Sequence, residues 1–295
     1  MRQSEERYIS LLTDFGFKRI FGTDPNKDLL INFLNSLFNG EEVIKDVRYL
    51  NSENVGDVYT ERKAIFDVYC ENERGEKFIV EMQNAYQTFF KDRSLFYSTF
   101  PIREQAPKSS DWNFCLKKVY VVALLNFKMS DEAFDSSDTI HTIALMDTKT
   151  NKVFNAKLMF KYVEVGRFDK ADNELTSLSD KWMYVLKNLS RLDDRPAALR
   201  EKIFTKLFDA AAIARFSPTE LREYEDSLKA YRDIKNSLDT AKAEGRAEGR
   251  AEGRAEGRAE VRAEVAKTMM EKGMDVKIIA SLTGLSEEEI KSLSK

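Results

Sequence analysis

The sequence predicts an α/β protein with one mixed sheet flanked by helices and a helical C-terminal extension. In the first half, segments with helical and strand-like spacing follow in the order helix, three strands, helix, strand, which is typical of a sheet covered by helices. Beyond Asn173 the apolar spacing is helical, and residues 243–258 repeat AEGR four times. We therefore expect a domain over residues 1–235, a charged helix or coiled coil over 236–266 and a small helical element over 267–295.

The N-terminal segments favour helices. Residues 14–21 have the spacing of a short amphipathic helix. Asp24 and Pro25 are suited to the N-cap and the first position of a second helix. Its apolar residues recur until Asn39-Gly40, a pair typical of helix ends.

Strand-like and helical segments then alternate. Strands are expected near 43–50, 64–71, 77–83, 119–125, 139–147 and 153–165. A helix is expected near 86–105, between the third and fourth of these strands. Helical spacing dominates after Asn173, with a further helix beginning at Ser217-Pro218.

Composition restricts the chemistry. The net charge is only −3, although a third of the residues are charged, so overall charge neither predicts nor excludes a nucleic-acid partner. The single histidine, His141, lies in a strand-like run and is expected to be structural. Catalysis by Ser–His–Asp, by Cys–His or by a two-histidine zinc motif would need more imidazole, or this residue. An enzyme of this composition would depend on carboxylates, lysines and a hard metal ion.

The sequence also bears on location. The polar N-terminus lacks a signal-like apolar segment, and no apolar run approaches the ~20 residues of a membrane helix. Cys70 and Cys115 are expected to be buried thiols in a reducing compartment rather than a disulfide. We therefore expect a cytoplasmic protein that has no membrane partner.

Two acidic residues in neighbouring strand-like segments are the main candidates for chemistry. Gly75 suits the left-handed position of a three-residue hairpin loop. If Asn72 pairs with Glu76, Asp67 lies opposite Glu81, with their Cβ atoms ~5 Å apart. The period of two then places Gln83 on the same face as Glu81.

Opposed carboxylates in a half-buried sheet repel each other. They are tolerated when a cation binds between them, when one is protonated, or when basic side chains neutralise both. A hard ion such as Mg²⁺ binds one or two carboxylates together with water and phosphate oxygens. The alternative is a surface hairpin whose acids are solvated or paired with Lys63 and Arg93.

The spacing of Asp67, Glu81 and Gln83 resembles the PD-(D/E)XK nuclease superfamily, with glutamine at the usual lysine position. Residues 13–22 (TDFGFKRIFG), Lys63 and the phrase VEMQ around Glu81 are similar to one branch, the PD-(D/E)XK nuclease family transposases, related to the recombination-promoting nucleases. The resemblance covers residues 8–130 firmly and extends loosely to 235. It implies a restriction-endonuclease-like sheet, a DNA partner, and Mg²⁺ (or Mn²⁺) bound by the two acids.

The resemblance also implies that Gln83 orients water or a phosphate oxygen, although an amide can neither carry positive charge nor act as a base. Lys63 could supply that charge, but it lies ~13 Å further along its strand. Asp14 and Lys18 could act as a further ligand and a phosphate contact, or form only an i,i+4 surface pair. Arg93 and Tyr97 could contact DNA phosphate. The alternative there is a packed tyrosine beside a solvated arginine.

The C-terminal region predicts self-association. In one helix the glutamates and the arginines of the AEGR repeat form separate stripes that repel internally, whereas two copies could pair acid with base. Residues 276–286 resemble the first helix and turn of a helix-turn-helix. The second helix would open with Glu287, Glu288 and Glu289, an unfavourable charge for meeting phosphates. A helical terminator or protein-contact element is therefore the preferred interpretation.

The functional hypothesis is a Mg²⁺-dependent DNA endonuclease associated with transposition or recombination. It would act as a homo-oligomer assembled through the repeat helix, and the glutamine could weaken its activity. One alternative is a catalytically inactive protein that keeps the nuclease fold for binding DNA or another protein. Another is a regulator built around the charged tail.

Overall fold

The computed structural model describes residues 6–54, 64–106, 112–129, 134 and 137–293. The chain forms two compact units, Met1–Lys235 and Asn236–Lys295. Within the described residues, no helix has both the length and the apolar character needed to cross a membrane.

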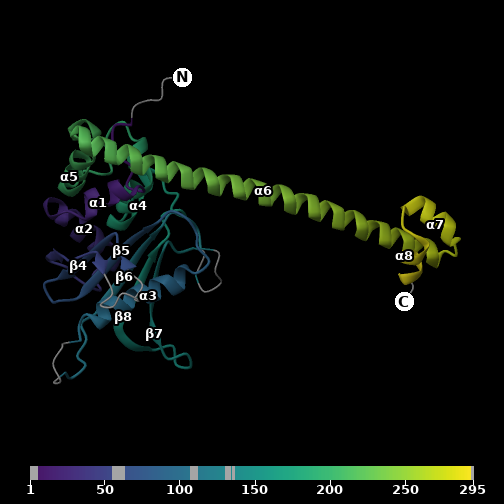
Figure 1. The fold of residues 1–295 in the computed structure, drawn as a ribbon, viewed down its shortest axis with the longest axis horizontal. Helices are drawn as coiled ribbons and strands as arrows, with labels where there is room; N and C mark the ends of the chain where they lie inside the picture. The colour runs from purple at the N-terminus through teal and green to yellow at the C-terminus, as the bar shows by residue number, and fades with distance from the viewer. Residues whose placement is uncertain (1–5, 55–63, 107–111, 130–133, 135–136, 294–295) are drawn as a thin grey trace. The chain divides into compact units, whose positions relative to one another are not determined.

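The first unit contains a six-stranded mixed sheet (Figure 1). Its strands, in spatial order, are β1 (Val47–Tyr49), β4 (Val68–Asn72), β5 (Lys77–Gln83), β6 (Val119–Leu125), β8 (Val153–Val163) and β7 (Ile140–Met146). β5, β6 and β8 are parallel, whereas β1 with β4, β4 with β5, and β7 with β8 pair antiparallel. Two short strands, β2 (Glu53–Asn54) and β3 (Ala64–Ile65), pair separately. The predicted fold class is confirmed.

Helices cover both faces of this sheet (Figure 1). One face buries Phe78, Val80 and Val122 in a core shared with α1 (Asp14–Phe21), α2 (Lys27–Phe38), α4 (Leu178–Asn188) and α5 (Lys202–Ala211). The other face buries Ile79 and Val121 against α3 (Phe90–Arg103). Successive strand residues therefore enter different cores, as the two-residue period requires. Short 3₁₀ turns lie at Asp24–Asn26, Asp172–Glu174, Leu189–Arg191 and Ile213–Arg215.

The β4–β5 hairpin has the predicted register. The Asn72 amide donates to the Glu76 carbonyl at 3.0 Å, and Gly75 has a φ of +74°, a left-handed conformation that favours glycine. Val68 lies opposite Val80, so the next pair of the ladder is Asp67 and Glu81. The hairpin loop thus determines which residues face each other at the far end of these strands.

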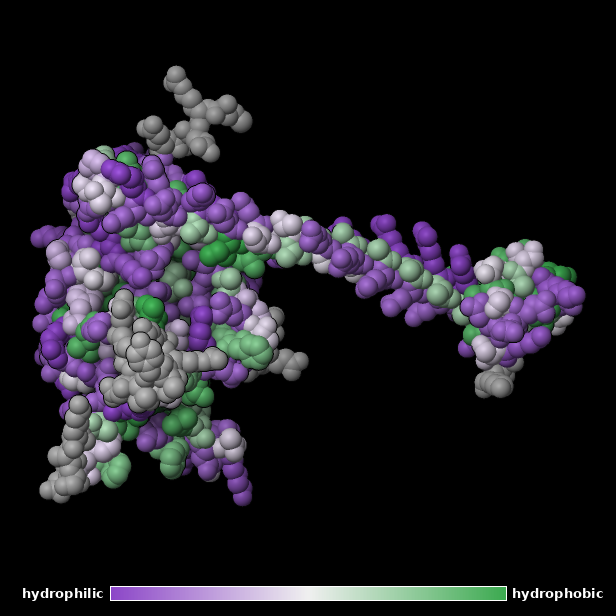
Figure 2. Space-filling view, viewed as in Figure 1, coloured by the Kyte–Doolittle hydropathy of each residue, from purple (hydrophilic) through white to green (hydrophobic). Residues whose placement is uncertain are grey.

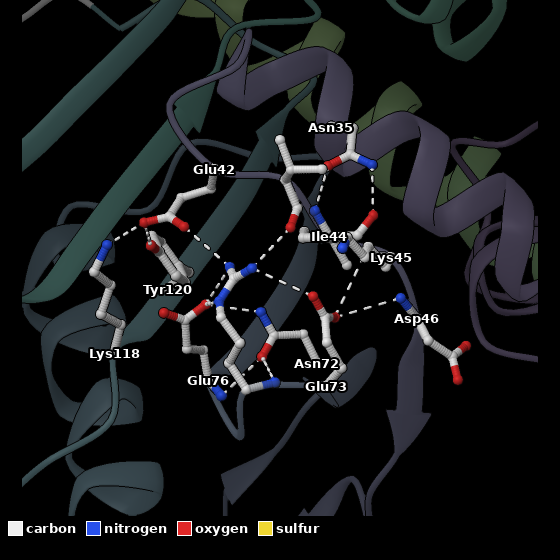
Figure 3. Close-up of polar contacts among 12 residues, drawn as sticks. Asn35, Glu42, Ile44, Lys45, Asp46, Asn72, Glu73, Glu76, Lys118 and Tyr120 are labelled. Atoms are coloured by element: carbon white, nitrogen blue, oxygen red, sulfur yellow. Dashed lines mark hydrogen bonds and ion pairs between the residues drawn. The ribbon is translucent and has the colours of Figure 1, made fainter.

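A polar network holds the loop end of this hairpin (Figure 3). The buried Glu76 carboxylate accepts hydrogen bonds from Asn72 Nδ2 at 2.7 Å and Arg74 Nη2 at 2.6 Å. Arg74 also pairs with Glu42 at 3.0 Å, and Glu42 accepts a 2.7 Å hydrogen bond from the Tyr120 hydroxyl. Because a one-residue slip would reverse every side chain, these contacts help to maintain the register.

Several local expectations are wrong. Asp24 does not cap α2 but lies in a 3₁₀ turn, and α2 begins at Lys27, because Asn26 Nδ2 binds the Arg19 carbonyl at 3.0 Å and ties this turn to α1. The expected 64–71 strand is interrupted because the Asp67 amide donates to a side chain, that of Glu81, instead of continuing the ladder.

Two further local predictions concern a cysteine and the sole histidine. Cys115 is exposed, contrary to expectation, because it lies in the irregular segment before β6, whereas Cys70 is buried. His141 is buried on the edge strand β7, with Nε2 2.8 Å from Glu164 Oε1. β6 and β8 separate it from β5, as expected for a structural histidine.

Most of the second unit is helical. α6 (Pro218–Glu271) begins in the first unit and continues through the AEGR repeat, where long hydrophilic side chains alternate with small residues (Figure 2). α7 (Val276–Thr283) and α8 (Glu287–Ser292) follow. Ala266, Ile279 and Ile290 form a small buried core between these helices.

Candidate metal centre

Asp67 and Glu81 are joined by reciprocal hydrogen bonds. The Asp67 amide donates to Glu81 Oε1 at 3.2 Å, and the Met82 amide donates to Asp67 Oδ2 at 2.8 Å. The side chain of Glu81 is buried, with 8% of its surface exposed. Each carboxylate thus contacts the partner segment while keeping one oxygen outside these two bonds.

Gln83 connects this pair to α3. Its Nε2 donates a hydrogen bond to Glu81 Oε2 at 3.4 Å, and its Oε1 accepts a hydrogen bond from Arg93 Nη2. Arg93 Nη1 donates to Gln87 Oε1 at 2.6 Å. The guanidinium of Arg93 is therefore not simply solvated, as one interpretation of the sequence held, but lies beside the amide that replaces lysine.

Tyr97 lies one helical turn beyond Arg93. Its ring centroid is 5.8 Å from the Arg93 guanidinium carbon, and its ring meets Phe66 edge to face at 5.4 Å. Burial raises the pKa of Tyr97, and the field of Glu81 raises it further. The packed-tyrosine interpretation therefore describes its ring, while its hydroxyl is within the electrostatic reach of the carboxylates.

α1 provides the second charged pair near the carboxylates. Asp14 and Lys18 form the i,i+4 ion pair expected from their spacing, at 2.8 Å. Although burial lowers the pKa of Lys18, its bond to Asp14 and the fields of Asp67 and Glu81 raise it overall. The expected i,i+4 pair is thus confirmed, whereas the roles of Asp14 as a further ligand and of Lys18 as a phosphate contact stay predictions.

The position of α1 depends on a tight turn before it. Thr13 caps the helix by accepting the Gly16 amide at 3.0 Å and donates to the Ser10 carbonyl at 2.8 Å. A Cβ on Gly16 would lie 2.1 Å from that carbonyl oxygen, so glycine is required. Asn84, directly after β5, donates to the Leu12 carbonyl at 2.8 Å. The turn is therefore tied to the strand that carries Glu81 and Gln83.

Residues of α6 also hold this turn, which sequence reasoning missed. The Ser10 amide donates to the Tyr224 hydroxyl at 3.0 Å, and the Phe15 amide donates to Ser227 Oγ at 3.0 Å. Contacts across more than 200 positions have no local pattern. The available signal was the helical spacing of buried Tyr224, which predicts packing without naming its partner.

The carboxylate pair is electrostatically strained. Burial raises the pKa of Glu81 to about 8, and the charge of Asp67 contributes in the same direction. Burial also raises the pKa of Asp67, and the charge of Asp14 raises it further. The hydrogen bond from the Met82 amide and the charges of Lys18 and Arg93 lower it, but the net shift is upward. Among the described residues, no cation lies within ion-pairing distance of either carboxylate. Nearby positive charge therefore relieves the repulsion only in part.

These donors fit a hard divalent cation. Two opposed carboxylates are the protein ligands that Mg²⁺ typically takes, with water and phosphate oxygens completing its shell. The part of the chain that the structure describes contains no cluster of three or more His, Cys, Asp or Glu side chains suited to a metal. Lys63 lies outside the described residues.

Comparison with known families agrees with this geometry. Residues 11–241 match the PD-(D/E)XK nuclease family transposase family, and residues 259–295 match the C-terminal HTH domain of the Rpn/YhgA-like nuclease family. No curated protein and no solved structure gives a significant match to the chain.

The second match corrects the preferred interpretation of the C-terminus. The acidic opening of α8 favoured a helical terminator or protein-contact element over a helix-turn-helix, but these helices pack through the buried Ile279–Ile290 core and the Gly284 turn, whose φ is +71°. Surface charge does not alter that packing. Since the first match spans most of its length, the chain belongs to the PD-(D/E)XK nuclease family transposases and carries a C-terminal helix-turn-helix domain of the Rpn/YhgA-like nuclease type.

Proposed function

We propose that this protein is a Mg²⁺-dependent DNA endonuclease that hydrolyses phosphodiester bonds during transposition or recombination. The observation that carries the proposal is the opposition of Glu81, which is buried, and Asp67, which is half-buried, with no ion pair to either among the described residues. Burying two like charges together is unfavourable unless a cation binds there. Family membership supports the same chemistry.

In this proposal Asp67 and Glu81 bind the metal ion, with Asp14 as a further acidic group near it. The bound ion would lower the pKa of a water molecule and stabilise negative charge on the phosphate. Gln83 orients water or a phosphate oxygen through its amide. Mn²⁺ is an equivalent hard ion for the same donors.

Positive charge in the site comes from α1 and α3. Lys18 and Arg93 both act electrostatically on the carboxylates, and in this proposal they bind a phosphate, with Tyr97 packed beside Arg93. Because Gln83 is uncharged, we propose that Arg93 compensates for part of the missing lysine charge. Activity would still be weaker than with a lysine, since a guanidinium does not exchange protons near neutral pH.

The remaining parts concern assembly and location. We propose a nuclease domain over 1–235 (core 8–130), an oligomerising repeat helix over 236–266 and a helix-turn-helix element over 267–295. We also propose the cytoplasmic location that the sequence predicts.

The decisive assay incubates the full-length protein with supercoiled plasmid in Mg²⁺ or in EDTA. We expect nicking only with Mg²⁺, and none from Asp67→Ala or Glu81→Ala. Both variants should remain folded by circular dichroism, because each removes a repelling charge. Glu223→Ala, at an exposed position of the same unit, is the matched control and should cleave normally. Normal cleavage by either site variant would show that the pair is structural.

The second candidate is a catalytically inactive protein that uses the nuclease fold to bind DNA or another protein. It is favoured by one observation, the engagement of Gln83 between Glu81 and Arg93 without a titratable base. Metal-independent DNA binding without cleavage by the wild-type protein would support this candidate over the first.

A further inference from the structure

We propose that Tyr86 and Phe89 form a stacking platform for unpaired nucleobases beside the carboxylate pair. The site would then bind single-stranded DNA in preference to intact duplex. This inference rests on the proposed function, because it names the substrate class of that same site.

The platform belongs to the segment between β5 and α3. Residues 86–89 are all exposed, and the two aromatic rings in it are exposed to 54% (Tyr86) and 73% (Phe89). The sequence predicted a helix here, which would have buried part of this surface, but α3 begins only at Phe90. Large aromatic side chains bury much of their surface in most proteins, so two exposed rings within the segment 86–89 indicate a binding surface.

The segment is held against the catalytic candidates at both ends. Its first residues follow Gln83, and Phe89 directly precedes the helix that carries Arg93. Arg93 hydrogen-bonds both to Gln83 and to Gln87 within the segment. A nucleotide whose phosphate lies at Arg93 would therefore have its base within the region of these rings.

The loop that follows the neighbouring strand β6 contacts this segment at the same end of the sheet. Phe127, which follows β6, meets the Tyr86 ring at 90° with centroids 5.7 Å apart. β5 and β6 are parallel, so both loops extend from their carboxyl ends, where open α/β sheets bind ligands. Lys128, next in the chain, is exposed. Contact with Phe127 restrains Tyr86 while leaving half of its surface accessible.

The combination of exposed aromatic rings and cations favours single-stranded over double-stranded DNA. Aromatic side chains interleaved with basic ones are what sequence-tolerant single-strand sites use, since every base has a π face. In an intact duplex those faces are covered by neighbouring base pairs, which leaves exposed rings without a partner. Arg93, which donates to Gln87 within this segment, and the exposed Lys128 beside Phe127 supply the positive charge on this edge.

The test measures binding of the full-length protein in EDTA, where hydrolysis does not interfere. Two probes are compared: a fluorescein-labelled oligonucleotide of mixed sequence as a single strand, and the same oligonucleotide annealed to its complement. Binding of each is measured by fluorescence anisotropy at the same salt concentration. We expect Tyr86→Ala and Phe89→Ala each to weaken single-strand binding about 5- to 150-fold, equivalent to about 1–3 kcal/mol. Duplex binding should not change, and Tyr86→Trp and Phe89→Trp should retain single-strand binding.

Phe154→Ala is the matched control, because Phe154 is 83% exposed on β8, outside the platform. The platform would be overturned if the alanine variants lost the same affinity for both probes, if they lost none for either, or if Phe154→Ala lost as much as they did. A protein partner would then be the better explanation of the exposed rings. Plasmid cleavage separates this result from the proposed function. If the alanine variants lose single-strand binding but the wild type never cleaves, the platform stands and the nuclease proposal fails. If the wild type cleaves plasmid but the alanine variants bind single-stranded DNA as tightly as the wild type, the nuclease proposal stands and the platform fails.

Discussion

Replacing Glu81 by glutamine should stabilise the metal-free protein. The carboxylate is buried beside Asp67, and its pKa is raised to about 8 by burial and by that neighbouring charge. Glutamine keeps the size of the side chain and an oxygen that can accept the Asp67 amide. It removes the charge that the fold accommodates poorly without a cation.

The magnitude follows from proton linkage. The ordinary pKa of 4.5 applies to the unfolded chain, so between that value and about 8 the folded protein holds a proton that the unfolded chain releases. Stability is therefore full below pH 4.5 and is lost as pH rises through about 8. At pH 7 the cost is at most about 3 kcal/mol. Allowing about 1 kcal/mol for a weakened hydrogen bond, Glu81→Gln should gain about 2 kcal/mol, or about 4–8 °C in Tm.

Thermal unfolding in EDTA, followed by far-UV circular dichroism across neutral pH, measures this difference. The wild type should lose stability as pH rises, whereas the variant should have a flatter profile. Mg²⁺ should raise the Tm of the wild type more than that of the variant, since ligands stabilise the state they bind. Glu223→Gln, at an exposed position, should change stability by less than about 0.5 kcal/mol. A variant no more stable than wild type, with the same pH profile, would refute the argument for strained carboxylates.

Three further outcomes are expected. Gln83→Lys places a positive charge between the carboxylates and Arg93 and should preserve or raise Mg²⁺-dependent plasmid nicking, whereas complete loss would point to a specific need for the amide. Gly16→Ala sets a Cβ 2.1 Å from the Ser10 carbonyl oxygen and should cost about 1–3 kcal/mol; an unchanged denaturation midpoint would show that the turn is not tightly packed. A chain ending at Asp239 should sediment at a lower oligomeric state than the full chain at low salt. That difference should shrink toward ~1 M salt, where the screening length is ~3 Å, and equal states at low salt would exclude the tail as the source of assembly.

The sequence by itself determined the central hairpin. Gly75 and the two-residue strand period are local properties, so counting from Asn72–Glu76 was enough to place Asp67 opposite Glu81. The strands at 77–83 and 119–125 were predicted with the bounds observed, because the apolar runs at 78–80 and 119–125 are rich in β-branched residues and leave few alternatives. Family-specific phrases around these elements then pointed to the nuclease fold.

The tertiary structure decided what surrounds the hairpin. The bond between Arg93 and Gln83, the bracing of α1 by Tyr224, and the exposure of Phe89 all depend on how distant segments meet. Helical spacing predicts which side of a helix is buried but not which partner buries it. Helical spacing also extended α3 too far toward its N-terminus, since the helix begins at Phe90 and not near Tyr86.

The C-terminus shows the same division between pattern and packing. Its helices and the Ser286 cap could be read from sequence, because capping is local. Its domain type was misjudged from the charge of Glu287–Glu289, which faces solvent, whereas the fold follows from the few buried contacts among Ala266, Ile279 and Ile290. Local chemistry therefore specified elements and register here, while burial between elements distant in sequence specified the site's charges, supports and accessible surface.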